Sequence, residues 1–231
     1  MTLQTQQLSC ARAGTVLFDM LDLMVRPGEA LKVSGPNGAG KSSLLRILCG
    51  LTEPTSGHVR WQGRAIHRQP DLLHRAVFYF GHHSALKDDL TAIENLRMAT
   101  LLSGRPCSSE QARQALTALG LGEFKHTMVG HLSQGQRRRV SLARLALTPQ
   151  PRLLILDEPF NALDQPALAQ LTSLLRQHLF EGAVLVYTTH QDMPLDGLLH
   201  HEVCLARTCP ATVTNALASP AWVVRPMGIA A

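Results

Sequence analysis

The sequence predicts an α/β fold, and three observations support this prediction. Short apolar runs alternate with longer amphipathic segments, as strands and helices do in α/β proteins. Apolar residues make up 45% of the 231-residue chain, which is an ordinary share for a globular core. A mostly helical block interrupts the alternation at about residues 88–148, so we expect a helical subdomain inserted in an α/β core.

The first elements surround a glycine-rich turn. Residues 29–34 are predicted to form a strand that ends at this turn. Residues 41–49 are predicted to form the helix that follows, with Gly50 as its C-terminal cap. Residues 57–61 and 76–80 have the composition of further strands.

Capping residues mark the helices of the inserted block. Thr91 is a good N-cap, and Glu94 three residues later completes a capping box. Ser108 or Ser109 can cap a second helix, and Ser133 can cap a third. The block is therefore predicted to contain at least these helices.

The β pattern returns after the block. Residues 153–156 and 183–188 are predicted to form buried strands. Asp164 is the expected N-cap of a helix between them, with Pro166 in its first turn. We expect one domain over residues 1–206.

The C-terminal tail, residues 207–231, differs from the rest of the chain. It holds Pro210, Pro220 and Pro226 and lacks a clear period. We expect it to be weakly ordered or dependent on a partner.

Composition excludes several classes of protein. No apolar run approaches the roughly 20 residues that cross a bilayer, and no basic stretch precedes an apolar one at the N-terminus, so neither a membrane span nor a signal peptide is expected. The five cysteines contain no CxxC pair, which argues against a disulfide framework or a zinc finger and favours a reducing compartment. The net charge of +5 suits an anionic ligand or membrane face, but it is too small for a dedicated nucleic-acid binder.

One run matches the phosphate-binding pattern GxxxxGK[ST] in full, between a predicted strand and a predicted helix. It consists of Gly35, Pro36, Asn37, Gly38, Ala39, Gly40, Lys41 and Ser42, and Ser43 follows as a further phosphate-binding candidate. Glycines let backbone N–H groups turn toward phosphates, and the helix N-terminus adds partial positive charge. Lys41 brings a mobile charge, and the Ser42 hydroxyl is a hard oxygen ligand for Mg²⁺. The motif therefore predicts nucleotide binding.

Two acidic residues follow the strand predicted at residues 153–156. Asp157 lies at the carboxyl end of this strand, where ligands bind in such sheets. We expect Asp157 to hold Mg²⁺ through water and Glu158 to be the base that polarises the attacking water. Pro159 disfavours the alternative of a helix start with acidic caps.

The order of the motifs resembles the ATP-binding cassette (ABC) family over about residues 3–206. Leu-Ser-Gln-Gly-Gln at residues 132–136, Asn-Ala-Leu-Asp at residues 161–164 and His190 after a predicted strand carry the resemblance. It implies the core of a P-loop NTPase, with a mainly parallel sheet, an antiparallel β subdomain and the inserted helical subdomain.

The resemblance also implies roles for single residues. Ser133 and Gly135, with Gln136 in the same motif, would contact the γ-phosphate of an ATP bound to the other subunit. Asp164 would lie at the dimer interface. His190 would contact the γ-phosphate and hold the base and the water in line. Two chains are then expected to pair head to tail, so that ATP completes each site by closing the dimer.

Two positions depart from the family pattern. A glutamine that faces Mg²⁺ and water is expected near residue 83, where this chain has Gly-His-His-Ser at residues 81–84. A neutral imidazole can bond water, so we expect His83 to keep a weaker form of this role. An aromatic that stacks on adenine is replaced by Ala11 and Arg12. Arg12 either stacks through its guanidinium or leaves the adenine loosely held.

A narrower resemblance points to one subfamily, the ATP-binding subunits of haem exporters for cytochrome c maturation. The Gly-His pair at residues 81–82 and the Thr-Thr-His-Gln run at residues 188–191 are its most specific segments. The resemblance implies an ATPase that uses ATP and Mg²⁺ and forms a homodimer on ATP binding. It also implies docking on integral membrane permease subunits at the cytoplasmic face of the bacterial inner membrane, as a peripheral subunit that powers haem export.

Other functions stay open at this point. The chain could serve another exporter, for a drug or a lipid, or be a soluble cassette ATPase of iron–sulfur cluster assembly. A DNA-repair ATPase would need a long heptad insertion, which this sequence lacks, so nucleic acid is not an expected partner.

Three other features have ordinary interpretations. The arginines at residues 137–139 fan out around one predicted helix, which favours a solvated or interface face over a nucleic-acid patch. The leucine-rich face of residues 91–102 is either core or a dock for a helix of a partner. A group of histidines and cysteines fits no zinc spacing, so ligation is not expected there. Its members are His200, His201, Cys204 and Cys209.

Overall fold

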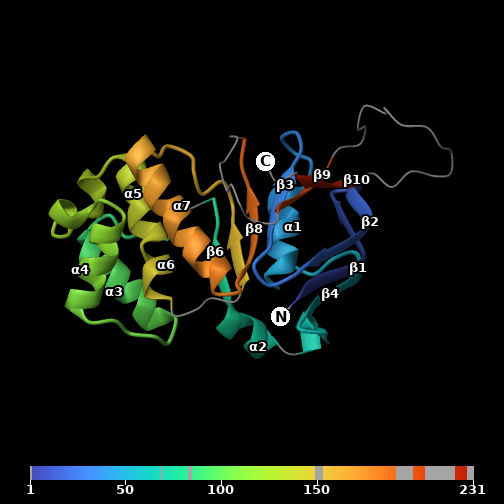
Figure 1. Cartoon of the computed structure of the whole chain (residues 1–231), viewed down its shortest axis with the longest axis horizontal. Coiled ribbons are helices and arrows are strands. Elements are labelled where there is room, and N and C mark those ends of the chain that lie inside the picture. The colour runs from blue at the N-terminus through green and yellow to red at the C-terminus, as the bar shows by residue number, and fades with distance from the viewer. Residues whose placement is uncertain are drawn as a thin grey trace.

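The computed structural model describes residues 2–68, 70–82, 85–148, 153–190, 200–205 and 222–227. A block of helices lies at one end of the molecule, a six-stranded sheet lies in the middle, and an antiparallel sheet lies at the other end (Figure 1). This arrangement is the predicted one: an α/β core with an antiparallel β part and an inserted helical part.

The six-stranded sheet has the order β10-β9-β3-β8-β7-β6. Its strands are β3 (Ala30–Ser34), β6 (Val77–Phe80), β7 (Leu153–Leu156), β8 (Val184–Thr188), β9 (His200–Leu205) and β10 (Trp222–Met227). All neighbours are parallel except β10, which is antiparallel to β9. β7 and β8 are buried along their whole length, because both faces of the sheet are covered. The parallel direction brings the carboxyl ends of β3, β6, β7 and β8 to one edge.

The second sheet is antiparallel, with the order β2-β1-β4-β5. Its strands are β1 (Leu3–Arg12), β2 (Thr15–Val25), β4 (Ser56–Trp61) and β5 (Arg64–Ala65). Ala13 and Gly14 both have positive φ, 46° and 74°, as the tight turn between β1 and β2 requires. Trp61 is 5% exposed and packs in the core.

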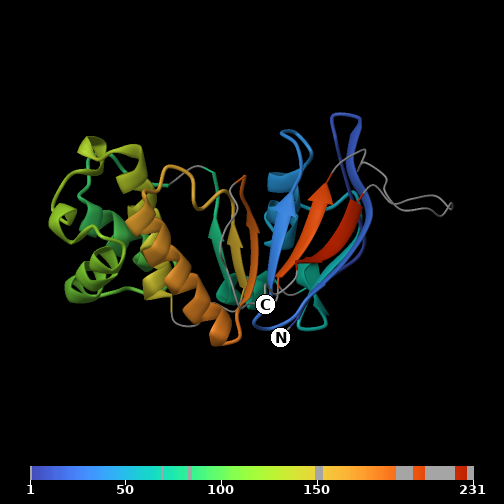
Figure 2. The same cartoon turned by 45° about the horizontal axis from the view of Figure 1, so that its top comes forward.

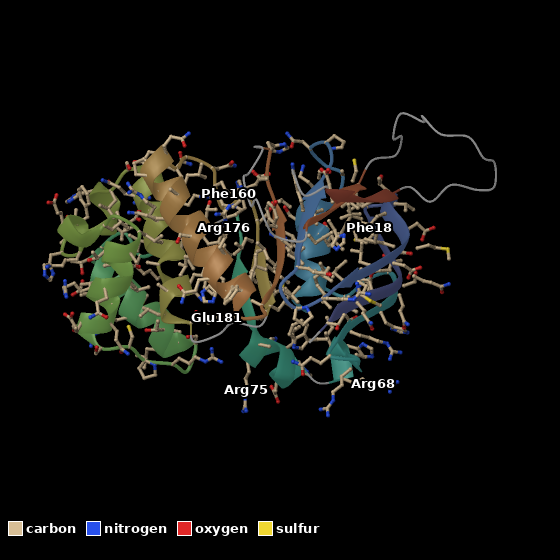
Figure 3. The ribbon with its side chains drawn as sticks, viewed as in Figure 1. Phe18, Arg68, Arg75, Phe160, Arg176 and Glu181 are labelled. Atoms are coloured by element: carbon tan, nitrogen blue, oxygen red, sulfur yellow. The ribbon has the colours of Figure 1, made fainter. Side chains whose placement is uncertain are left out.

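Helices cover both faces of the parallel sheet (Figures 1 and 2). The helix α1 (Lys41–Leu48) fills the space toward the antiparallel sheet, and α7 (Gln165–Phe180) covers the opposite face. The short elements η1 (Ile66–Arg68) and α2 (Pro70–Ala76) lead from β5 to β6. Phe18 and Phe160, each 1% exposed, belong to the separate cores on the two faces (Figure 3).

Three helices of the inserted block begin where the capping residues predict. It contains α3 (Ala92–Leu102), α4 (Ser109–Ala118), η2 (Gly122–Phe124), η3 (Val129–His131), α5 (Gln134–Leu142) and α6 (Arg144–Leu147). Thr91, Ser108 and Ser133 each form a capping box, so Ser108 is the cap of the second helix. Asp164 caps α7 by accepting a hydrogen bond from the backbone N–H of Ala167 at 3.0 Å.

The leucine-rich face of α3 is divided between core and surface. Leu96 is 1% exposed, whereas Leu101 and Leu102 at the end of the helix are 62% and 79% exposed. Within the described ranges, no helix combines the length and the apolar character needed to span a membrane.

The tail differs from the expectation at residues 222–227. These residues form β10, which pairs with β9 from Trp222 opposite Leu205 to Met227 opposite His200. The rest of the range 207–231 lies outside the described residues. Pro226 weakens the strand signal in the sequence, because proline is tolerated in a sheet mainly on an edge strand, and β10 is an edge strand.

Candidate functional site

The phosphate-binding motif forms the turn between β3 and α1, and two of its glycines are required by close contacts. Gly40 has φ 101°, and a Cβ there would lie 2.9 Å from the Cβ of Leu17. Gly35 has φ 138°, and a Cβ there would collide with the carbonyl oxygen of Leu205 at the end of β9. Larger residues cannot occupy these positions without moving the neighbouring strands.

Lys41 is the first residue of α1, and its side chain folds back over the loop. Its Nζ donates to the carbonyl oxygens of Gly35 at 2.7 Å and Pro36 at 3.2 Å. An ammonium has three donors, so this placement leaves it able to bind an anion held against the helix N-terminus.

The acidic pair is held by Thr188 at the end of β8, which is fully buried. The Thr188 hydroxyl donates to Oδ1 of Asp157 at 2.7 Å and accepts from the backbone N–H of Glu158 at 2.8 Å. The backbone N–H of Asp157 donates to the carbonyl oxygen of Phe80 at 2.7 Å. Three neighbouring strands thus position the two carboxylates together.

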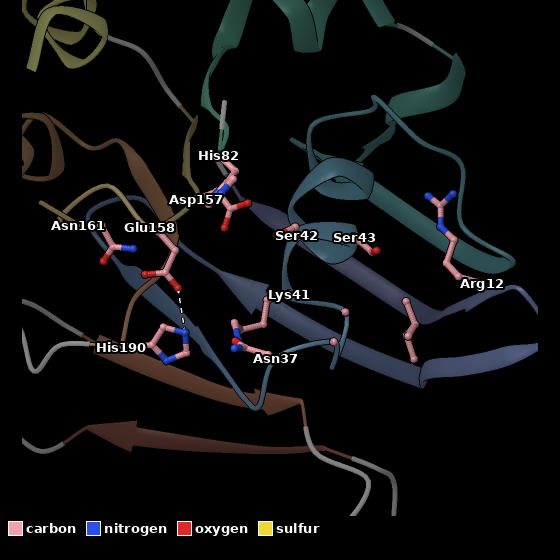
Figure 4. Close-up of a pocket in the computed structure, with 13 residues that line it drawn as sticks. Arg12, Asn37, Lys41, Ser42, Ser43, His82, Asp157, Glu158, Asn161 and His190 are labelled. Carbon is pink, nitrogen blue, oxygen red and sulfur yellow. Dashed lines mark ion pairs between the residues drawn. The ribbon is translucent and has the colours of Figure 1, made fainter. Parts of the chain in front are cut away.

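Glu158 and His190 face each other across the site (Figure 4). Nε2 of His190 lies 3.3 Å from Oε1 of Glu158. The other oxygen of Glu158 is buried and has no hydrogen-bond partner among the described residues, which is uncommon for a buried polar atom. Glu158 has φ 52°, an unusual value for a residue other than glycine, of the kind found at functional sites.

These groups surround one cavity of about 500 Å³. Predicted site residues from both motifs line it: Arg12, Asn37, Gly38, Gly40, Lys41, Ser42, Ser43, Asp157, Glu158 and His190. Gly35, Pro36 and Ala39 belong to the same loop without lining the cavity. His83 lies outside the described residues, so its predicted role is a proposal only.

Sequence reasoning missed three of the lining residues. Leu17 lies on β2, next to Arg12 along the cavity wall. His82 follows β6 and immediately precedes His83, the residue that the sequence predicts to bond the water. Asn161 is the first residue of the run at residues 161–164, and it also lines the cavity. No local sequence signal identifies Leu17, because its place on the wall depends on how the β1–β2 hairpin folds over the phosphate loop.

Four predicted residues outside the phosphate loop do not line this cavity. Ser133, Gly135 and Gln136 lie at the start of α5, and Asp164 lies at the start of α7. Ser133 is exposed, and its hydroxyl accepts from the backbone N–H of Gln136 at 3.2 Å. A hydroxyl that accepts one bond can still donate its own proton to a phosphate. These four residues therefore lie outside the cavity of their own chain.

Each of the three arginines that follow has its own partner within the chain, so together they do not form a solvated face. Arg137 donates to Asp88 at 2.6 Å and to the carbonyl oxygen of Val129 at 2.9 Å. Arg138 donates to carbonyl oxygens of the loop that carries the acidic pair. Arg139 lies 4.0 Å from Asp164.

The histidine and cysteine group near β9 gives no sign of ligation where it is described. Among the residues that the structure describes, no three side chains of His, Cys, Asp or Glu are placed to hold a metal ion. His201 instead lies 3.5 Å from Glu29. Cys209 lies outside the described residues.

Comparison with curated proteins points to one group of relatives. The chain is 46% identical over 192 residues to the cytochrome c biogenesis ATP-binding export protein CcmA of Aromatoleum aromaticum, across 83% of this chain and 90% of the relative. The protein of the same name from Pseudomonas savastanoi is 48% identical over 191 residues, across 83% and 89%. The one from Nitrosomonas europaea is 42% identical over 204 residues, across 88% and 95%.

Solved structures share the fold. An ATP-binding subunit of an ABC transporter is 26% identical, with a TM-score of 0.76 over 88% of this chain and 85% of that one. The ATP-binding cassette MJ0796, in a dimeric post-hydrolysis state with bound ADP and Pi, is 25% identical, with a TM-score of 0.71 over 82% and 88%. The ABC transporter family model matches residues 18–161. The expected fold class and the resemblance to CcmA are confirmed, and the chain belongs to the ABC transporter family as one of its ATPases.

Proposed function

We propose that this chain is the ATP-hydrolysing subunit of a haem exporter for cytochrome c biogenesis. One observation carries the ATPase part: Lys41, Asp157, Glu158 and His190 meet around a single cavity at the carboxyl edge of the parallel sheet. The names of the CcmA relatives support the transport part.

The cavity suits ATP with Mg²⁺. Lys41 and the N-terminus of α1 face the place of the phosphates. Ser42 offers a hydroxyl oxygen, and Asp157 offers a carboxylate that Thr188 fixes through one oxygen, which is a hard-oxygen donor set of the kind that Mg²⁺ prefers. Bound there, Mg²⁺ would neutralise charge on the phosphate oxygens. Arg12 and Leu17 would face the adenine from the far wall of the cavity.

Glu158 and His190 supply the proton chemistry in this proposal. Glu158 accepts a hydrogen bond from the attacking water and takes up its proton as the water oxygen bonds to the γ-phosphorus and the bond from that phosphorus to the leaving ADP oxygen breaks. His190, beside it, fixes the carboxylate and contacts the phosphate. His83 would bond the same water in place of the usual glutamine.

The remaining motif residues are proposed to act across a homodimer. Ser133, Gly135 and Gln136 would face the ATP of the partner chain from the exposed start of α5, and Asp164 would lie at the interface. The dimeric state of MJ0796 supports this arrangement. ATP then closes the pair and completes both sites.

The location follows from the proposed transport role. The chain would dock on integral membrane permease subunits at the cytoplasmic face of the bacterial inner membrane. The exposed leucines at the end of α3 offer apolar surface for such a contact.

Complementation tests the assignment. The full chain is expressed in a bacterium that lacks its own CcmA, and c-type cytochromes are measured by haem staining. We expect the wild-type chain to restore them and the Glu158→Gln variant to fail.

Two results would contradict the proposal. If both Glu158→Gln and Lys41→Ala keep the ATP turnover of the wild-type chain, the proposed catalytic site is refuted. Turnover without recovery of cytochromes, together with the co-purification of other membrane subunits or of soluble partners only, would refute haem export in favour of another transporter or a soluble scaffold ATPase.

A further inference from the structure

Arg138 ties α5 to the loop that carries Glu158. Its Nη2 donates to the carbonyl oxygen of Asp157 at 3.2 Å and also to that of Glu158, and its Nε donates to the carbonyl oxygen of Pro159 at 3.4 Å. The guanidinium carbon lies 5.0 Å from the ring centre of Phe80, at the end of β6. One side chain thus contacts the backbone on both sides of the proposed base.

Two more contacts join the same helix to the same loop. A Cβ at Gly135 would collide with the carbonyl oxygen of Ala162, so the two backbones lie directly against each other. Arg139 lies 4.0 Å from Asp164, where the loop ends. The start of α5 and residues 157–164 are therefore expected to move together.

The helix and the loop serve different ATP sites in the proposed dimer. The start of α5 presents Ser133 and Gly135 to the ATP of the partner chain, whereas Glu158 acts on the ATP of its own chain. Glu158 and Ala162 have φ values of 52° and 60°, which such residues keep only when their surroundings hold them. Arg138 donates a hydrogen bond to the carbonyl oxygen of Glu158.

We propose that Arg138 is a positioning residue that couples the two ATP sites. Engagement of α5 with the ATP of the partner chain would shift the guanidinium, which would carry the carbonyls around Glu158 with it. A planar guanidinium suits this task because it holds several acceptors in a fixed geometry. The inference rests on the proposed homodimer. It adds a path within one chain that leads from the nucleotide of the partner chain to Glu158, the chain's own base.

The test compares variants of the purified full chain in ATP turnover. Arg138→Met keeps an apolar stem over Phe80 but removes every donor. We expect its kcat to fall about tenfold, because the base is misplaced rather than removed. We also expect the Hill coefficient for ATP to fall from a cooperative value to that of independent sites. Arg138→Lys, which retains the charge and can bond only part of the acceptor set, should give intermediate values.

Arg137→Met is the matched control. Arg137 is the preceding residue on the same helix, and its bonds go to Asp88 and Val129, away from the loop. We expect it to keep the cooperative response of the wild-type chain. Thermal unfolding of each variant shows whether the fold is intact, and Arg138→Lys provides the measurement if Arg138→Met does not fold.

Three results would overturn the inference. The first is an Arg138→Met variant that turns over ATP like the wild type, and the second is one whose turnover falls while its Hill coefficient stays at the wild-type value. The third is a wild-type chain without cooperativity. The proposed dimer is tested separately, by size-exclusion chromatography of Glu158→Gln with ATP. A trapped dimer there, with any of these three results, would refute the coupling role alone. Absence of the trapped dimer would refute the homodimer itself.

Discussion

The imidazole of His190 lies 3.3 Å from the carboxylate of Glu158, between the ends of two neighbouring strands. A histidine in this position can fix the direction of the carboxylate and contact a phosphate at the same time. The proposed chemistry depends on this pair, and replacing either residue is expected to have a distinct effect.

Replacing His190 by alanine should lower kcat about a hundredfold and leave the KM for ATP nearly unchanged. The loss falls on the chemical step, because the phosphate loop still binds the nucleotide. Steady-state phosphate release measures both constants. His126→Ala, at an exposed position of the helical block, is the control; an equal loss there would point to a general effect of losing a histidine.

Replacing Glu158 by glutamine should stop turnover and preserve ATP binding. The amide keeps the shape of the side chain but accepts protons poorly, so the chain should accumulate in its ATP-bound form. Size-exclusion chromatography should then show a dimer with ATP and a monomer with ADP. A monomer under both conditions would contradict the head-to-tail arrangement.

Replacing Thr188 by valine should cost about 1–3 kcal/mol of stability, because a buried N–H and a buried carboxylate oxygen each lose a partner. Valine has nearly the same shape as threonine, so packing is retained. Turnover should fall as well, since Asp157 and Glu158 lose a common support. Chemical denaturation measures the stability, with Thr117→Val on the exposed side of α4 as the control.

Buried His178 should make the stability depend on pH. Burial lowers its pKa, an effect that the nearby charge of Glu181 only partly opposes. The folded chain therefore holds His178 neutral, while the unfolded chain takes up a proton below about pH 6.5. Stability is fully present above this pH and is lost as the pH falls toward the lower pKa of the folded state. His178→Leu should flatten the slope of Tm against pH on the acidic side, and an unchanged slope would assign the effect to other histidines.

His82 and His83 make a pair of comparable variants. His82 lines the cavity, whereas the role of His83 stays a prediction. If His82 is the residue that faces the water, His82→Ala should reduce turnover more than His83→Ala does. The opposite order would support His83 as the residue that bonds the water.

The residues at the centre of the site belong to local sequence motifs, whereas those on its walls are brought there by the tertiary fold. Lys41, Asp157 and Glu158 could be predicted because strand, turn and helix are consecutive there and the chemistry requires those residue types. Leu17 could not, because its place depends on how the β1–β2 hairpin folds over the loop.

The antiparallel sheet shows why its strands are hard to predict from their own residues. The pairing of β1 with β2 shifts register three times, and Gln7 and Met20 have positive φ. Each bulge moves the following side chains to the other face, so the alternation of buried and exposed residues is broken. The caps of the helical block needed no such context, because a capping box is closed within one turn.

The contact between Gly35 and the end of β9 has a consequence for the synthesis of the protein. The phosphate loop is near the start of the chain, but β9, against which it rests, is among the last strands to be made, and β8 on the other side of β3 is also made late. A ribosome that has finished the glycine-rich motif has therefore not yet supplied the walls that hold it. The affinity of the nascent chain for ATP should rise abruptly once Leu205 has emerged from the ribosome, rather than gradually as each motif appears.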